Sequence, residues 1–432
     1  MMNKFMRILE KYLLPIAEKL GKNRYLNVLK DAFMLSFPLT IFGSLFVVIS
    51  NLPFLKLFMS ENKINILKQS LAPALEGSML IATLFVVMGL GYYLTSSYKI
   101  EGIYGAAVAI SAFFLVTPLE NGGMPLDKLG AKGMFVGIVV GIVASELYRR
   151  AVQRGWIIKL PDTVPPAVLK SFSALVPGFL TLSFFLVIRI LFSLTPFENI
   201  HNFIFVTIQT PMMKLGGGLT ATIIAIIMTQ LLWFFGLHGQ VIVNSVLDPV
   251  WNTLSLENLE AFQAGKEIPN IISKQFIEIF TVGLGGTGMT LAVAFTLLFV
   301  VKSRQLKELG KMAGPAAIFN VNEPIIFGLP IVMNPMIFIP WVISPVIVVI
   351  FTYVMMSLGI VGIPTGVNVP WTVPIFFNGI LATNSITGGI LQIINFFIVF
   401  IVWFPFIKLL DKKANEEEKN TQEEDLDLSL DL

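Results

Sequence analysis

The sequence predicts an all-α polytopic membrane protein with about ten transmembrane helices and re-entrant hairpins. Three observations lead to this fold class. Hydrophobic residues make up 55% of the chain and charged residues only 13%, whereas about a quarter of the residues in a soluble protein are charged. Apolar stretches that approach the roughly 20 residues needed to cross a bilayer recur along the sequence. No charged residue occurs between positions 324 and 407.

Residues 1–31 precede the first apolar stretch and contain seven basic residues in an amphipathic pattern. A signal peptide has a continuous apolar centre, which this segment lacks. We therefore expect residues 1–31 to form an amphipathic cytoplasmic segment along the inner surface of the membrane.

Nine apolar windows follow, and clusters of basic residues separate some of them. The windows are 32–55, 77–95, 102–119, 133–147, 171–193, 218–237, 279–301, 336–358 and 389–407. Basic residues gather before residue 31 and at 149–159, 302–311 and 408–413. The positive-inside rule assigns all of these clusters to the cytoplasm.

Nine crossings cannot leave both ends of a chain on the same side of a membrane, so a tenth crossing is needed. The best candidate is 201–217, whose short uncharged core is interrupted by Pro211 and followed by Lys214. With this crossing, every basic cluster falls inside. We predict a multi-pass protein of the cytoplasmic (inner) membrane with both termini cytoplasmic.

Three further apolar segments are dense in Gly, Pro, Asn and Thr, namely 238–248, 312–335 and 362–388. Irregular backbone is tolerated at membrane depth only where it is buried in protein or lines a polar cavity. All three segments lie in the second half of the chain. We therefore expect a scaffold half in residues 32–195 and a substrate-binding transport half with re-entrant hairpins in residues 196–410.

The end of the chain differs in composition, because residues 411–432 hold nine acidic residues and three lysines. Such a segment cannot bury enough apolar surface to fold by itself. We expect an acidic, solvated and disordered tail rather than a docking element.

Glu323 stands at the head of the long uncharged run, directly before Pro324. A carboxylate within a membrane costs roughly a few kcal/mol, so it marks a functional site by default. Prolines and glycines on both sides prevent a continuous helix. We expect a re-entrant hairpin that carries Asn320, Asn322 and Glu323 into a solvated pocket. The alternative is a surface loop with a merely solvated Glu323.

His238 ends an apolar window between Gly236 and Gly239, where the backbone is free to turn. Beside an intramembrane carboxylate it would supply a second polar group for a ligand hydroxyl, which needs an acceptor and a partner that balances charge. The alternative is a structural histidine at a helix end. Its tautomer does not follow from the sequence.

Trp371 lies between Pro370 and Pro374, where it can offer a flat apolar face to the ring of a ligand. The alternative is an aromatic residue of the membrane interface. Asn378 follows in a segment whose amides can bond ligand hydroxyls. Hydrogen bonds between helices are the competing explanation, since buried polar groups need partners.

The chain has no cysteine and only two histidines, His201 and His238. Disulfides and thiolate metal sites are therefore excluded, and we predict neither a metal site nor a cofactor. Two glycine-rich runs, 216–218 and 283–288, lack the Lys-Ser/Thr ending of a phosphate loop. Close helix packing or a hinge is the favoured interpretation. Nothing supports binding of nucleic acid.

Three motifs resemble signatures of a known family, in the same order and at similar separations. They are Phe235-Gly236-Leu237-His238-Gly239, Asn322-Glu323-Pro324 and Val369-Pro370-Trp371-Thr372. The family is the sugar-transporting membrane subunit (IIC) of the bacterial phosphotransferase system (PTS), in the lactose/cellobiose/diacetylchitobiose group. The resemblance extends to about residue 410 and implies a homodimer with ten spanning helices, two re-entrant hairpins and a transport half that moves against a dimerising half.

The resemblance also implies a function, in which a disaccharide such as diacetylchitobiose, cellobiose or lactose is transported and phosphorylated on its 6-hydroxyl. Glu323 would activate that hydroxyl, and His238 would be a second sugar contact. The phosphate would come from a phosphocysteine of a separate phosphorylated IIB subunit, because this chain contains no cysteine. Membrane lipid and a second copy of the chain are the other expected partners. Residues 376–387 are less typical of the family, so the particular disaccharide stays open.

Two functions of other classes compete with this one. A proton-coupled secondary sugar transporter would use Glu323 as its coupling site, and a passive channel would use it as a filter charge. The chemical form of the accumulated sugar distinguishes the three functions.

Overall fold

The computed structural model describes residues 15, 19–51, 55–120, 122–161, 163–329, 331 and 334–430, without the side chains of 48, 56, 57 and 421–430. Regular structure in these ranges is helical, and the only β pairing within them is an isolated bridge between Glu120 and Gly123. The predicted all-α class is confirmed. Most of the expected amphipathic segment 1–31, namely 1–14 and 16–18, lies outside the described residues.

Two compact units divide the described chain. Unit 1 contains Gly218–Val243 and Glu267–Leu432, and unit 2 contains Glu18–Gly217 and Asn244–Lys266. The division in the middle of the chain falls at 217, later than the expected boundary at 195. Helix α13 (Gly239–Gln263) begins in unit 1 and ends in unit 2.

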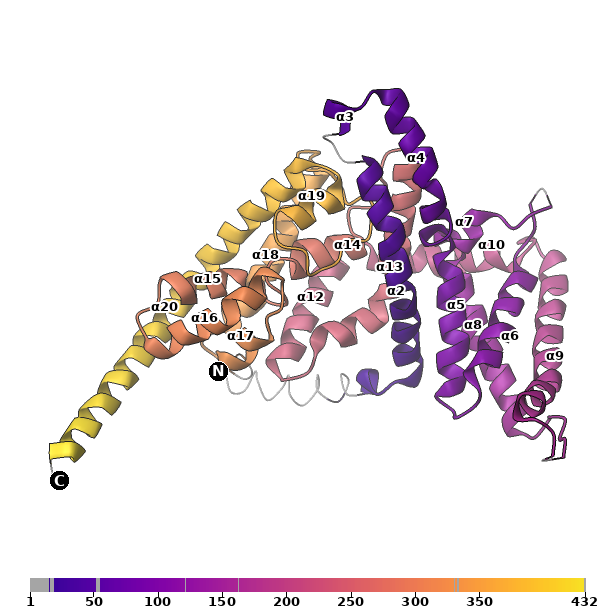
Figure 1. Ribbon diagram of the computed structural model, residues 1–432, viewed down its shortest axis with the longest axis horizontal. Coiled ribbons are helices and arrows are strands. Elements are labelled where there is room, and N and C mark those ends of the chain that lie inside the picture. The colour runs from indigo at the N-terminus through magenta and orange to yellow at the C-terminus, as the bar shows by residue number, and fades with distance from the viewer. Residues whose placement is uncertain are drawn as a thin grey trace. The chain divides into compact units, whose positions relative to one another are not determined.

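Unit 2 holds the helices of the first half of the chain. They are α2 (Arg24–Asn51), α3 (Leu55–Phe58), α4 (Glu61–Glu76), α5 (Ala82–Ser96), α6 (Gly102–Val116), α7 (Leu126–Leu129), α8 (Met134–Gln153), α9 (Pro166–Ser193), α10 (Ile200–Ile204) and α11 (Thr210–Gly216), with 3-10 turns at Met79–Ile81 and Ala131–Gly133 and a π-helix at Phe205–Gln209. Helices α5, α6, α8 and α9 pack side by side (Figure 1). Small residues permit this close packing, since Gly91 of α5 lies directly against Gly105 and Ala106 of α6.

Unit 1 holds the helices of the second half. They are α12 (Leu219–Phe234), the start of α13, α14 (Lys274–Ile277), a π-helix at Glu278–Val282, α15 (Leu291–Phe299), α16 (Arg304–Ile318), α17 (Glu323–Gly328), α18 (Phe338–Ser357), α19 (Phe377–Thr383) and α20 (Ile386–Leu430). Its core contains the fully buried Trp341 and Trp403. The indole Nε1–H of Trp341 donates to the carbonyl of Gln230 at 2.9 Å, which joins α18 to α12.

Six helical segments in the described ranges are long and apolar enough to cross a membrane. They are Arg24–Asn51, Glu61–Ser96, Ala131–Gln153, Pro166–Ser193, Phe338–Ser357 and Ile386–Asn420. Gly102–Val116 is a shorter apolar helix, and Ile200–Gly216 and Leu219–Phe234 pass the same test together as one broken span. The segment proposed as the tenth crossing is thus helical, and its crossing stays a prediction.

Two of the expected elements are wrong. Window 279–301 was expected to be one continuous span, but it breaks between Val282 and Leu291, because glycines there adopt positive φ angles that a helix does not allow. Segment 238–248 was expected to be irregular, but it forms the first turns of α13, since nothing between Gln240 and Asp248 interrupts a helix. Segments 312–335 and 362–388 contain breaks, as expected.

The acidic end of the chain also differs from expectation. Helix α20 continues from the apolar span to Leu430 instead of ending as a disordered tail at Asp411. Two of its carboxylates, Asp411 and Glu418, accept hydrogen bonds from the start of α16. Seven positions separate these two residues, so they share one face of α20, and the contacts to α16 hold this part of the helix in place.

Candidate functional site

The turn between Val282 and Leu291 connects the candidate site residues. Gly285, Gly286 and Gly288 have φ angles of +95°, +79° and +80°. A Cβ atom on Gly286 would clash with the side chain of Asn322, and one on Gly288 would clash with the ring of Trp341. The turn therefore needs glycine both for its backbone angles and for the side chains that press against it. We call residues 283–290 the glycine turn.

Asn320 ties the glycine turn to the segment that contains Trp371. Its side chain is only 1% exposed, and its φ angle is +64°, in the left-handed region that asparagine tolerates. The side-chain Oδ1 accepts from the backbone N–H of Gly285 at 2.7 Å. The Nδ2 group donates to the carbonyls of Trp371 at 2.6 Å and Val373 at 3.1 Å. The amide is thus engaged with backbone on both sides.

Asn322 fixes the residue that precedes Glu323. Its Nδ2 group donates to the carbonyl of Thr287 at 2.6 Å. Its own carbonyl accepts from the backbone N–H groups of Ile325 and Ile326, both at 2.9 Å, and so begins helix α17. A short helix anchored in this way holds its first residue in a defined position.

Glu323 is the first residue of α17, with Pro324 following it in the first turn. Proline is favoured there because its missing N–H has no partner in the helix. The Glu323 side chain is exposed, although Asn322 before it and Ile325 and Ile326 after it are buried. No hydrogen bond or ion pair within the described residues engages its carboxylate. The scaffold therefore presents an acid whose oxygens can accept from a ligand.

His238 lies at the start of α13. Its Nδ1 atom accepts from the backbone N–H of Val241 at 3.4 Å in the first turn of the helix. The ring packs against Trp233, with ring centroids 4.4 Å apart. Two residues later, Gln240 Oε1 accepts from the hydroxyl of Thr287 at 2.9 Å. The His238 segment is therefore attached to the same glycine turn as Asn320 and Asn322.

Trp371 and Asn378 differ in exposure. The Trp371 side chain is 37% exposed, whereas Asn378 is fully buried. Asn378 Nδ2 donates to the carbonyl of Gly283 at 3.2 Å, and its Oδ1 atom has no hydrogen-bond partner within the described residues. Gln392 of α20 supports the start of α19, because its Oε1 accepts from the N–H groups of Phe376 and Gly379 while its Nε2 donates to Ile279.

The structure thus connects all of the predicted site segments through one turn. Residues of the glycine turn form hydrogen bonds with the side chains of Asn320, Asn322, Gln240 and Asn378. The sequence of this run favours helix packing or a hinge and does not connect it with the site. Thr287, Gln240 and Gln392 were missed as well. The run Gly283-Leu284-Gly285-Gly286-Thr287-Gly288 was the available signal, and nothing in it identifies the partners.

The fold and this site define a class of protein: a helical membrane protein with an exposed carboxylate held by broken helices in an uncharged part of the chain. The family model described as "Phosphotransferase system, EIIC" matches residues 30–345. The chain belongs to this family.

Relatives support the membership over nearly the full length. The chain is 54% identical over 426 residues to the "PTS system oligo-beta-mannoside-specific EIIC component" of Bacillus subtilis (strain 168), covering 96% of each chain. It is 41% identical to the "PTS system cellobiose-specific EIIC component" of Geobacillus stearothermophilus, covering 97% of each. The solved structure of the transporter ChbC, the IIC component of an N,N'-diacetylchitobiose-specific phosphotransferase system, aligns with a TM-score of 0.90 and 38% identity, covering 95% of this chain and 99% of that one.

Proposed function

We propose that this chain is a sugar permease that binds and translocates a β-linked disaccharide and presents its 6-hydroxyl for phosphorylation by a separate IIB subunit. Family membership supports the transport of a sugar. The similar proteins named for oligo-β-mannosides, cellobiose and diacetylchitobiose support a β-linked substrate. Cellobiose, diacetylchitobiose and lactose are the first candidates to test.

The observation that carries this proposal is the exposed carboxylate of Glu323 beside two buried asparagines. Asn320 and Asn322 hold the backbone on one side of Glu323 through the glycine turn. This arrangement anchors the backbone that carries the carboxylate, and no group among the described residues bonds its oxygens. A positioned acceptor of this kind is what a general base requires.

Glu323 acts as the base in the proposed phosphoryl transfer. Its carboxylate accepts the proton of the sugar 6-hydroxyl while that oxygen forms a bond to phosphorus. The bond between phosphorus and the cysteine sulfur of IIB breaks, and the sulfur leaves as a thiolate. The step needs no other reactant, because the phosphate, the sugar and the base account for every atom and electron.

The other predicted residues divide into two groups by exposure. His238 and Trp371 are exposed and are proposed to contact the sugar, with the indole face of Trp371 against a pyranose ring. Asn320 and Asn322 position the site, since their amides are engaged with backbone carbonyls and N–H groups. Asn378 combines the two roles in this proposal, because its Nδ2 holds Gly283 and its buried Oδ1 can accept from a sugar hydroxyl.

The decisive experiment identifies the form in which the sugar accumulates. Membrane vesicles with this chain, IIB, the soluble phosphotransferase proteins and phosphoenolpyruvate should accumulate disaccharide 6-phosphate. An uncoupler should leave that accumulation unchanged when phosphoenolpyruvate is supplied. Unmodified sugar that disappears with the uncoupler would establish the proton-coupled transporter instead. Equilibration without accumulation would establish a channel.

The exposed face of α16 is the proposed docking surface for phosphorylated IIB. It carries Arg304, Lys307 and Lys311, of which Lys311 pairs with Glu308 at 2.8 Å. Neutral variants of Arg304 and Lys307 should raise the KM for IIB more at low salt than at high salt, because salt already screens exposed charges in the parent protein. If correctly inserted variants keep the KM for IIB of the parent protein, Arg304 and Lys307 serve only to set the membrane topology.

Both termini are proposed to be cytoplasmic, with residues 200–216 crossing the membrane. The cysteine-free chain permits a direct test with single cysteines at the exposed positions Pro196 and Lys307. A membrane-impermeant reagent applied from outside should label the first and not the second. Lys307 is chosen over the nearby Ser303, because Ser303 is buried and its hydroxyl donates to Glu418. Labelling of both positions from one side contradicts ten crossings.

A further inference from the structure

A cluster of arginines and one tyrosine lies at one end of unit 2, away from the glycine turn in sequence. Tyr98 follows α5, and its ring has two guanidinium groups above it. Arg24 of α2 has its Cζ atom 3.8 Å from the ring centroid, and Arg149 of α8 has its Cζ atom 4.2 Å from it. Three helices therefore meet at this ring, and two of them bring a positive charge to it.

The cluster contains more positive than negative charge. Glu146 accepts from Arg149 Nη2 at 2.5 Å, and its carboxylate lies 3.4 Å from Arg150 Nε. Arg149 also donates to Gln153 at 2.6 Å. Arg24, Arg149 and Arg150 against one Glu146 leave two positive charges without a negative counterpart inside the cluster. Arg149 is engaged by its partners, whereas Arg24 is exposed and the Arg150 side chain is 61% exposed.

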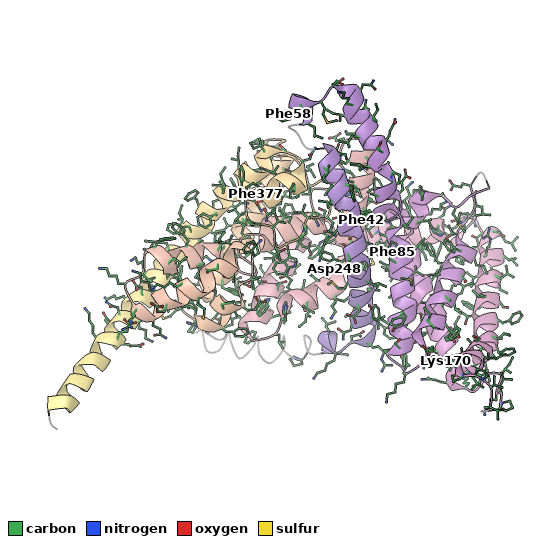
Figure 2. The ribbon with its side chains drawn as sticks, viewed as in Figure 1. Phe42, Phe58, Phe85, Lys170, Asp248 and Phe377 are labelled. Carbon is green, nitrogen blue, oxygen red and sulfur yellow. The ribbon has the colours of Figure 1, made fainter. Side chains whose placement is uncertain are left out.

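The surroundings of the cluster are typical of the end of a membrane-spanning unit, where protein meets the membrane surface. Helix α2 continues from Arg24 into an outward face with exposed Met34, Phe42 and Leu45, and Phe42 projects from this helix in Figure 2. Glu101 follows Tyr98 closely in the sequence, and its carboxylate lies 2.6 Å from the Nζ atom of Lys170, which Figure 2 labels. This ion pair marks the same end of the unit. Beyond α8, Trp156 is half exposed, and the Cζ atom of Arg154 lies 5.4 Å from the centroid of its ring. Tryptophan is enriched where a membrane meets water.

We propose that this cluster binds the headgroup of an anionic phospholipid. Arg24 and Arg150 contact the phosphate, and Glu146 holds Arg149 in place over Tyr98. The acyl chains follow the exposed apolar face of α2. A basic pocket between the ends of transmembrane helices is the kind of site that recognises such headgroups, and the excess charge of the cluster matches one or two phosphate groups.

The test compares lipid retention by the purified full-length protein. Native mass spectrometry and thermal unfolding in mixed micelles should show that phosphatidylglycerol binds and stabilises the protein more than phosphatidylcholine does. The variant Arg24→Gln/Arg150→Gln should reduce the preference by roughly 30-fold, and Arg150→Gln alone by roughly fivefold, if each charge contributes as a typical basic residue at a membrane surface. Arg24→Lys/Arg150→Lys keeps both charges and should retain most of the preference.

The matched control is Lys412→Gln/Lys413→Gln, which removes two exposed charges from α20 in unit 1. It should leave the preference for phosphatidylglycerol unchanged. An equal loss in the control variant would show that net charge alone attracts the lipid and would overturn the site. Equal binding of both lipids would do the same. Displacement of the lipid by millimolar glycerol 3-phosphate would identify a soluble-anion site and contradict the lipid assignment.

Discussion

The side-chain Oδ1 of Asn320 accepts the backbone N–H of Gly285 at 2.7 Å, while its Nδ2 donates to the carbonyls of Trp371 and Val373. One buried amide therefore holds together two segments that lie far apart in the sequence, and Glu323 follows it by three positions. We therefore expect the position of the proposed base to depend on this amide.

Substitution of Asn320 should disrupt the site in a graded way. Asn320→Gly keeps the left-handed backbone but removes three hydrogen bonds, so we expect a loss of about 2 kcal/mol or more in unfolding free energy. Asn320→Asp keeps the acceptor but turns a carboxylate oxygen toward two carbonyls, and it should be worse. Thermal unfolding and equilibrium sugar binding measure both effects. If the Asn320→Gly protein is as stable as the parent and binds sugar normally, Asn320 does not position the site.

Gly286→Ala should damage function beyond its effect on the backbone. The new Cβ would clash with Asn322 and approach the carbonyl oxygen of Asn320 within 2.8 Å. Gly359→Ala is the matched control, because Gly359 has a φ angle of +70° and nothing within 4 Å of an added Cβ. Both variants should lose about 1–2 kcal/mol through backbone strain. Only Gly286→Ala should also lose sugar phosphorylation. Equal activity in the two would show that the turn tolerates displacement of Asn322.

Glu323→Gln separates catalysis from recognition. Glutamine keeps the size of the side chain but removes the base, and loss of a general base typically costs a factor of roughly 10² to 10⁴ in rate. We expect the single-turnover rate of phosphorylation to fall by this factor, while equilibrium sugar binding weakens by about tenfold or a little more. A variant that binds poorly but phosphorylates normally at saturating sugar would make Glu323 a recognition residue.

The carboxylates of α20 should stabilise α16. Asp411 Oδ1 accepts from the N–H groups of Lys302 at 2.7 Å and Ser303 at 2.8 Å, and Glu418 accepts from those of Arg304 at 3.0 Å and Gln305 at 2.8 Å. These donors at the start of α16 have no partner within their own helix. The carboxylates also oppose the positive end of the helix dipole.

Asp411→Asn should therefore destabilise the protein by about 1–3 kcal/mol and speed hydrogen exchange at 302–305. Glu416→Gln is the control, since Glu416 is exposed and pairs with Lys412 only at 3.9 Å. It should change stability by less than about 0.5 kcal/mol. If Asp411→Asn leaves hydrogen exchange at 302–305 unchanged, the carboxylate of Asp411 does not hold the start of α16 against α20.

The sequence by itself determined the helical membrane class and most of the apolar helices, because these follow from local composition. It also singled out Glu323 as a candidate through the cost of a charge in an apolar setting, and the role of this residue stays a prediction. It also located the breaks around Glu323 and Trp371, since proline and glycine act on their own backbone. Only the tertiary structure decided what holds these residues. Asn320, Asn322 and Asn378 each bond a backbone group of residues 283–287, between 35 and 95 positions away, and Asn320 also bonds the carbonyls of Trp371 and Val373. Likewise, the acidic residues after 410 resemble a solvated tail until the start of α16 supplies the N–H donors that bind Asp411 and Glu418. Residue types reveal which groups need partners, and only the folded chain determines which partners they find.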